Sequence, residues 1–142
     1  YNLLDEEQQK KILEDTKDKK CFGIHIHTPD AATPKDGPSA GAAMTLAIYS
    51  ILTGKKVNNE VALTGEIDLC RNVTAIGGVY AKLNGAKRAG VTLALIPEEN
   101  MEDLERLRRE GISPEDETFE VKPISNIEDV IDYCMVCYHL KE

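Results

Sequence analysis

The chain has 142 residues, of which 42% are hydrophobic and 30% charged, so it is long enough for one domain with a core of its own. Its formal net charge of −8 argues against a nucleic-acid-binding surface, and no apolar run approaches the length of a membrane span. The acidic start at residues 1–7 is not a signal peptide and lacks an initiator methionine, so we expect a fragment of a longer protein.

The first half of the chain is predicted to hold two helices and a strand. Helical spacing with many Glu, Gln and Lys residues predicts an exposed helix over residues 4–18. Apolar alternation predicts a strand over residues 21–28, and three prolines make residues 29–38 a loop. The apolar run at residues 39–53 predicts a buried helix that ends at Gly54.

The middle of the chain is predicted to alternate between strands and a helix. Residues 61–68 alternate as a strand, and a turn near residues 71–72 joins them to a second strand at residues 73–76. Residues 79–89 read as a helix. The apolar run at residues 91–96, bounded by Gly and Pro, predicts a buried strand.

The last part of the chain adds two helices and a strand. Asn100 is predicted to cap a helix that runs to Arg109. Residues 118–122 are predicted to form a strand, and Ser125-x-x-Glu128 is a capping box that opens a final helix to about residue 137. Because strands and helices interleave, the sequence predicts a compact mixed α/β or α+β domain.

The four cysteines are scattered, and a domain of this size does not need disulfides for stability. We therefore expect reduced thiols in a cytoplasmic, intracellular protein. Cys134-x-x-Cys137 is the one pattern among them, and ordinary packing is favoured over a redox or metal role because no second ligand pair exists. No metal site is predicted.

Ser39 is the most informative residue, because it follows a proline and a glycine at the start of a predicted helix. A hydroxyl at a helix N-terminus lies where an oxyanion is stabilised, and the backbone N–H groups of residues 38–41 other than the proline are candidate donors. Gly-Pro-Ser-Ala-Gly matches the elbow of α/β-hydrolases, but a loop rather than a strand precedes it, and only His139 could complete that triad. The bland alternative is that Ser39 merely caps the helix.

Lys82 is the candidate base for this serine. A lysine on a helix is usually solvated. The neighbours of Lys82 are small or apolar, however, and burial lowers the pKa of a lysine by disfavouring its charged form. A neutral amine could then take the proton of Ser39, so the sequence favours a Ser–Lys pair.

Five further residues are candidates for a supporting role around this pair. Thr64 and Glu66 flank a glycine on a predicted strand, and Asp36 could line the cleft. His25 and His27 share a strand face and are favoured as scaffold residues, because a metal pair would need a third ligand. For each residue a purely structural role is equally plausible.

Together these segments resemble the proteolytic domain of the Lon family of ATP-dependent proteases. The resemblance rests on His25-Ile26-His27, the long serine motif at residues 32–41, Ala62-Leu63-Thr64-Gly65-Glu66-Ile67, Ile76-Gly77-Gly78 with Lys82, and Ile96-Pro97 with Asn100 and Asp103-Leu104. It implies that Ser39 is the nucleophile and Lys82 the general base of a serine endopeptidase. It also implies that Thr64, Glu66, Asp36, His25 and His27 shape or support the site.

The resemblance further implies a ribosomal-S5-domain-2-like α+β fold over residues 1–142, hexameric rings, and unfolded or misfolded proteins as substrates in protein quality control. ATP and Mg are implied only for a separate ATPase domain of a parent protein, and the N-terminal strands of the family domain are expected to lie outside this chain. No cofactor, nucleic acid or membrane contact is expected for this domain.

Two departures from the family pattern motivate a second hypothesis. Tyr80 and Ala81 replace a lysine and a glutamate that usually precede the base, and the chain contains no nucleotide-binding P-loop. The alternative is a non-catalytic oligomerisation or binding module of the same family. A small-molecule esterase is a third interpretation.

Overall fold

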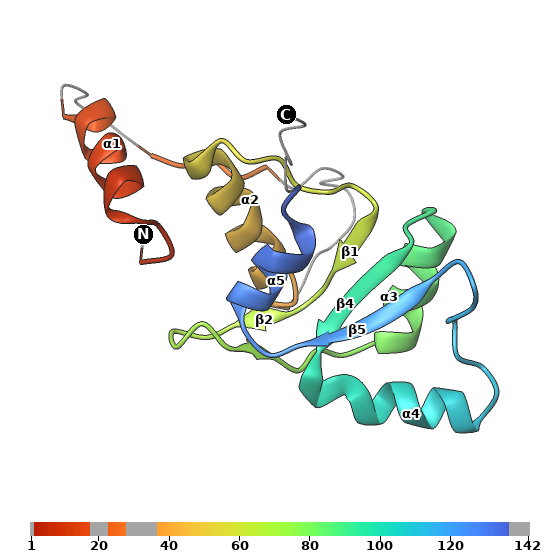
Figure 1. The fold of residues 1–142 in the computed structure, drawn as a ribbon. Helices are drawn as coiled ribbons and strands as arrows, with labels where there is room; N and C mark the ends of the chain where they lie inside the picture. The colour runs from red at the N-terminus through yellow and green to blue at the C-terminus, as the bar shows by residue number, and fades with distance from the viewer. Residues whose placement is uncertain (1, 18–22, 28–36, 137–142) are drawn as a thin grey trace.

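The computed structural model describes residues 2–17, 23–27 and 37–136, which form a mixed α/β domain around a small parallel sheet (Figure 1). Strands β1 (Val61–Leu63), β4 (Leu93–Pro97) and β5 (Glu120–Ile124) pair in the order β1-β4-β5, and both pairings are parallel. Strands β2 (Glu66–Ile67) and β3 (Val73–Thr74) form a separate antiparallel pair. The predicted mixture of helices and strands is confirmed.

The central strand β4 is buried on both faces. Leu95 packs into a cluster formed with α2 (Gly41–Thr53) and α5 (Ile127–Cys134). Ala94 and Ile96 point the other way, into a cluster that includes residues of α3 (Val79–Arg88) and α4 (Met101–Arg109). Side chains of a strand alternate between faces, so an apolar run of this kind is required where helices cover both sides of a parallel sheet.

All five predicted helices are present in the described residues, but the capping box of one of them differs from prediction. Helix α1 (Glu6–Thr16) contributes no buried residue and lies at the edge of the molecule beside α2 (Figure 1). The capping box of α5 consists of Asn126 and Asp129 rather than Ser125 and Glu128. Among the described residues, none of the helices has the length and the apolar composition of a membrane-spanning segment.

The predicted strand at residues 61–68 is interrupted at Thr64 and Gly65, and this correction matters for the site. The N–H of Gly65 donates to the carbonyl of Ser39 at 2.9 Å, and the carbonyl of Gly65 accepts from the N–H of Ala42 at 3.0 Å. The chain therefore leaves the parallel sheet to bind the start of α2, and it resumes as β2 in the other strand pair.

Two other predictions in the first half of the chain are wrong in part. Residues 23–27 of the predicted strand are exposed and form no strand, because no described strand pairs with them; residues 21, 22 and 28 lie outside the described part. Helix α2 is less buried than predicted, since only Ala42 and Leu46 are buried and Ile51 is 76% exposed. The predicted end at Gly54 is confirmed by its left-handed conformation, with φ of 70°.

We expect Gly65→Ala to lower the free energy of unfolding by about 1–3 kcal/mol, as overpacking of a core does. A Cβ at this position would lie 2.3 Å from Cγ1 of Val73. Urea unfolding checks this, with Gly85→Ala as the matched control. Gly85 lies within α3 and a Cβ built there would meet nothing within 4 Å outside the backbone of the helix, so alanine there should raise stability by up to about 1 kcal/mol. Equal effects of the two substitutions would contradict the expectation.

Candidate active site

Ser39 lies one residue before the N-cap of α2. The N-cap is Ala40, with no side-chain capping hydrogen bond, so Ser39 is not the helix cap. Its backbone carbonyl accepts from the N–H of Gly65 at 2.9 Å and from Oγ1 of Thr64 at 3.4 Å. The half-buried Ser39 has no side-chain hydrogen bond within the described residues, so its main chain is fixed while its hydroxyl is available.

Lys82 projects from the first turns of α3. Gly78 starts this helix in a left-handed conformation with φ of 71°, which glycine adopts without strain, and its carbonyl accepts from the N–H of Lys82 at 3.1 Å. Val79 and Leu83 anchor the helix in the core beneath the sheet. Lys82 itself is half-buried, and in the described part of the chain its amine forms no ion pair or hydrogen bond.

Ser39 and Lys82 both line the same two cavities. One is a largely apolar cavity of about 310 Å³, and Thr64 lines it together with small and aliphatic side chains of α2, α3, β1 and β4. The other has a volume of about 250 Å³, and Glu66 lines it with Gly37, Pro38 and residues 75–77. Ser39 and Lys82 thus share the walls of both cavities, so a chain bound in either cavity could contact both residues.

The other predicted site residues fall into two groups. Thr64 and Glu66 are half-buried and each lines one of the two cavities. His25 and His27 are exposed and line a different, apolar groove along α2, which reaches the site through Ala40. Asp36 lies outside the described residues, as do Cys137 and His139. The structure thus brings Ser39, Lys82, Thr64 and Glu66 together, but not the two histidines.

Asn100 is a residue near the site whose role the sequence analysis missed. It stands at the N-cap of α4, as predicted, but its side chain makes no cap hydrogen bond. Instead it bonds both backbone groups of Ile76, which is 24 residues away. The Asn-x-x-Asp spacing to Asp103 was the available signal, because Nδ2 of Asn100 also donates to that carboxylate at 3.0 Å.

Lys87 holds the C-terminal end of α3 in place. Its amine donates to the carbonyl of Pro114 at 2.7 Å and pairs with the carboxylate of Asp116. The hydrogen bond from Lys87 is the main reason why the pKa of Asp116 lies well below its ordinary value. Two hydrogen bonds from Thr118 to the same carboxylate lower this pKa further. The helix that carries Lys82 is therefore tied at its C-terminal end to the segment before β5.

The described cysteines play no part in these cavities. Cys134 is buried in the core, which agrees with the predicted packing role, and burial raises the pKa of its thiol to about 11. Cys70 is exposed. Within residues 2–17, 23–27 and 37–136, no group of three or more His, Cys, Asp or Glu side chains could hold a metal ion.

Comparison with known proteins identifies relatives over most of the chain. Residues 4–137 match the family model described as Lon protease (S16) C-terminal proteolytic domain. The chain is 42% identical over 130 residues to a Lon protease homolog of Acanthamoeba polyphaga mimivirus, covering 92% of this chain and 12% of that protein. It is 48% identical over 113 residues to a Lon protease of Lachnoclostridium phytofermentans, covering 80% and 14%. The chain thus spans only a small part of the length of these relatives.

We expect Asp116→Asn to lower the free energy of unfolding near neutral pH. The loss relative to the wild-type protein should become smaller as the pH falls. Because the folded-state pKa of Asp116 is depressed, its ionised form stabilises the fold above about pH 4, the ordinary carboxyl value, and this contribution is lost as pH falls through the folded pKa. Thermal unfolding between about pH 7 and pH 2 checks this. For Lys87→Met, the melting temperature should likewise differ from that of the wild-type protein by less as the pH falls. A difference in melting temperature that does not change with pH would contradict this expectation.

Proposed function

The chain belongs to the Lon protease family (S16), as part of its C-terminal proteolytic domain, and we propose that Ser39 and Lys82 hydrolyse peptide bonds as nucleophile and general base. It is a serine peptidase domain of this family, as the resemblance implied. The observation that carries the residue assignment is that both side chains line the same two cavities, while neither is engaged elsewhere among the described residues.

In the proposed reaction, the amine of Lys82 accepts the proton of the Ser39 hydroxyl as Oγ attacks the carbonyl carbon of the scissile bond. The resulting tetrahedral intermediate collapses when the Lys82 ammonium returns that proton to the leaving nitrogen. The C–N bond breaks and an ester links the acyl half of the substrate to Ser39. Water, deprotonated by the same amine, then hydrolyses the ester and restores the serine.

Two backbone N–H groups are the best candidates to stabilise the oxyanion. Gly41 was predicted to be a third donor, but its N–H donates to the carbonyl of Pro38 at 2.9 Å and is therefore not available to an oxyanion. The N–H groups of Ser39 and Ala40 have no partner within the described residues, and we assign the oxyanion to them. Loss of one such donor typically costs about 3 kcal/mol of transition-state stabilisation.

The supporting residues act on the position of Ser39 and on the walls of the site. Thr64 donates to the Ser39 carbonyl, and Glu66 adds a carboxylate to the smaller cavity. We keep Asp36, His25 and His27 as supporting residues. The groove that holds both histidines includes Ala40, the neighbour of Ser39, so their effect on the nucleophile is expected to pass through the start of α2.

The wider properties of the family extend this proposal to the protein of which residues 1–142 are the proteolytic part. We propose a ribosomal-S5-domain-2-like fold, six-membered rings, and unfolded or misfolded proteins as substrates. ATP and Mg would act in a separate ATPase domain, and the proteolytic domain itself would need no cofactor. The free thiols Cys70 and Cys134 support a reducing, intracellular location.

We expect Ser39→Ala and Lys82→Ala each to lower cleavage of a quenched fluorescent unfolded protein by at least about a hundredfold, as loss of a nucleophile or general base does. Ser50→Ala and Lys56→Ala are the matched controls. Ser50 lies near the other end of α2 and bonds the carbonyl of Lys55, while Lys56 is exposed. Circular dichroism checks that all four variants are folded. Turnover retained in Ser39→Ala or Lys82→Ala would refute the dyad.

A serine-directed covalent probe separates the peptidase from the non-catalytic module. We expect the probe to label the wild-type protein at Ser39, because deprotonation by Lys82 makes that hydroxyl nucleophilic. Lys82→Ala should lose the labelling and Lys56→Ala should keep it, as read by mass spectrometry of the peptide that contains Ser39. A folded wild-type protein with neither labelling nor cleavage would favour the binding module. Ester turnover without peptide cleavage would favour an esterase.

A further inference from the structure

We propose that Asn100 is a positioning residue that sets the location of Lys82 relative to Ser39; this inference rests on the proposed function. Asn100 is 4% exposed and is the one buried polar side chain among the described residues. Burial of an amide is costly unless its donors and acceptor are used. The hydrogen bonds of the Asn100 amide therefore indicate which part of the site this residue holds in place.

The Asn100 side chain binds a loop that is distant in sequence. Its Oδ1 accepts from the N–H of Ile76 at 2.9 Å, and its Nδ2 donates to the carbonyl of Ile76, also at 2.9 Å. The second hydrogen of Nδ2 is used by Asp103 at 3.0 Å. The preceding residue, Glu99, accepts from the N–H of Ala75 at 2.9 Å. Two consecutive residues of the loop are thus fixed from the end of β4.

This loop leads directly into the helix of the proposed base. Ile76 is followed by Gly77 and Gly78, and a Cβ at either glycine would meet nothing within 4 Å, so these two residues have little packing of their own. Gly78 then begins α3, and its carbonyl bonds the N–H of Lys82. The hydrogen bonds from Asn100 to Ile76 therefore fix the position of the N-terminus of α3, which the packing of the two glycines does not fix.

The same segment forms a wall of the site. Residues 75–77 line the smaller cavity together with Ser39 and Lys82, while Asn100 is not a lining residue and binds the segment from behind. The side chain of Ile76 packs against the core cluster that contains Val79 and Leu83 of α3. Asn100 can thus act on Lys82 without touching a substrate, which is why it is a positioning residue rather than a catalytic one.

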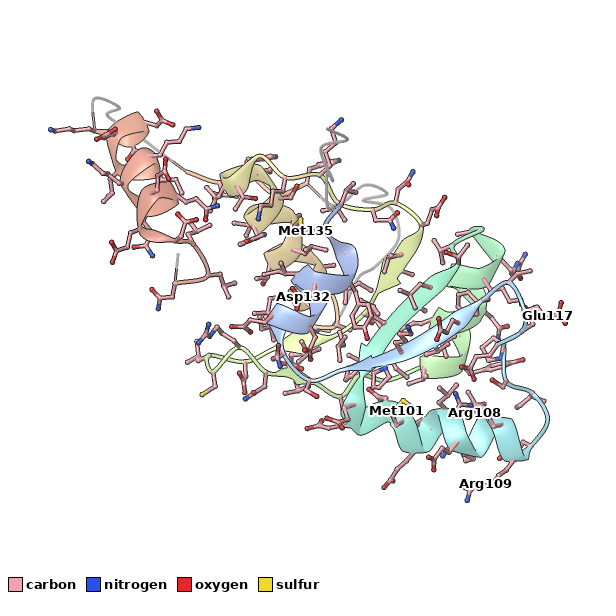
Figure 2. The ribbon with its side chains drawn as sticks, in the orientation of Figure 1. Met101, Arg108, Arg109, Glu117, Asp132 and Met135 are labelled. Carbon is pink, nitrogen blue, oxygen red and sulfur yellow. The ribbon has the colours of Figure 1, made fainter. Side chains whose placement is uncertain are left out.

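Strand β4 connects this hold to the nucleophile. The carbonyl of Leu95, in β4, accepts from the N–H of Thr64 at 3.2 Å, and Thr64 with Gly65 binds Ser39. Asn100 lies three residues after the end of β4, at the end of the 3₁₀ turn η1 (Glu98–Asn100). Figure 2 shows Met101, the next residue, where the chain turns into α4 below the sheet. One strand thus supports Ser39 at its middle and the loop before Lys82 just beyond its end.

Asn100→Asp is the sharpest test, because it keeps the shape of the side chain. An aspartate still accepts from the N–H of Ile76, but it places an oxygen against the carbonyl of Ile76 and the carboxylate of Asp103. We expect kcat for peptide cleavage to fall at least about tenfold with KM changed less than about twofold, because misplacement of a catalytic group reduces the chemical step. The labelling rate of Ser39 by a small covalent probe should fall by the same factor.

Two further variants separate positioning from a loss of stability. Asn100→Asp combined with Asp103→Asn restores a donor between positions 100 and 103, so it should recover much of the folding stability while kcat stays low. Val130→Ala removes core packing in α5, a helix that contributes no residue to the walls of either cavity, so it should lower the melting temperature without lowering kcat. All rates are measured well below the melting temperature of each variant.

The outcomes distinguish this inference from the proposed function. A wild-type protein without cleavage or labelling at Ser39 would defeat the proposed function itself. If the wild-type protein is active, the role of Asn100 alone would be overturned by a folded Asn100→Asp variant whose kcat and labelling rate are unchanged. A folded double variant with unchanged kcat and labelling rate would overturn it in the same way. Recovery of full kcat in the double variant would show that Asn100 serves only the stability of α4, and would overturn it as well.

Discussion

Two hydrogen bonds at Gly65 join the end of β1 to the start of α2, and the geometry of the site depends on them. They pass in opposite directions, from Gly65 to the Ser39 carbonyl and from the Ala42 N–H to Gly65. Together with the bond from Thr64, they fix the residue before the N-cap without using its hydroxyl. Close backbone approach of this kind needs a residue without a side chain, because the methyl of Val73 occupies the space where a Cβ would lie.

Strand β4 is the common base for both halves of the proposed dyad. On one side its Leu95 carbonyl binds Thr64, next to the residue that binds Ser39. Beyond its end, Asn100 binds the loop that enters the helix of Lys82. The strand is buried between helices on both faces, and groups borne on such an element are held more closely than groups on free loops. At the opposite end of α3, Lys87 and Asp116 complete the support.

Much of the fold could be read from the sequence, because periodicity reports which face of an element is buried. It located the five helices and the buried strand β4. Alternation alone could not show that the run at residues 61–68 breaks at Gly65, since the cause is a hydrogen bond to Ser39 in another segment. Nor could it show that residues 23–27 have no pairing strand among the described residues.

Within the site, the motif and its small neighbours were enough to select Ser39 and Lys82, which do line shared cavities. The spacing of Asn100 and Asp103 is a local signal for one hydrogen bond, but the other contacts of Asn100 and those of Lys87 are with residues 24 to 29 positions away, which a local pattern does not identify.

The order of the parallel sheet has a consequence for how the protein gains its reactivity. β1 and β4 are adjacent in space, but about thirty residues separate them, and β4 is joined to β5 by another long crossover. Such non-local pairings form slowly, because the chain loses the entropy of a long loop before the contacts are gained. Since residues of β1 and β4 line the larger cavity between the Ser39 segment and the Lys82 helix, this cavity requires the sheet to be formed. An enzyme whose proposed substrates are unfolded polypeptides thus acquires its cutting site only once its own folding is complete.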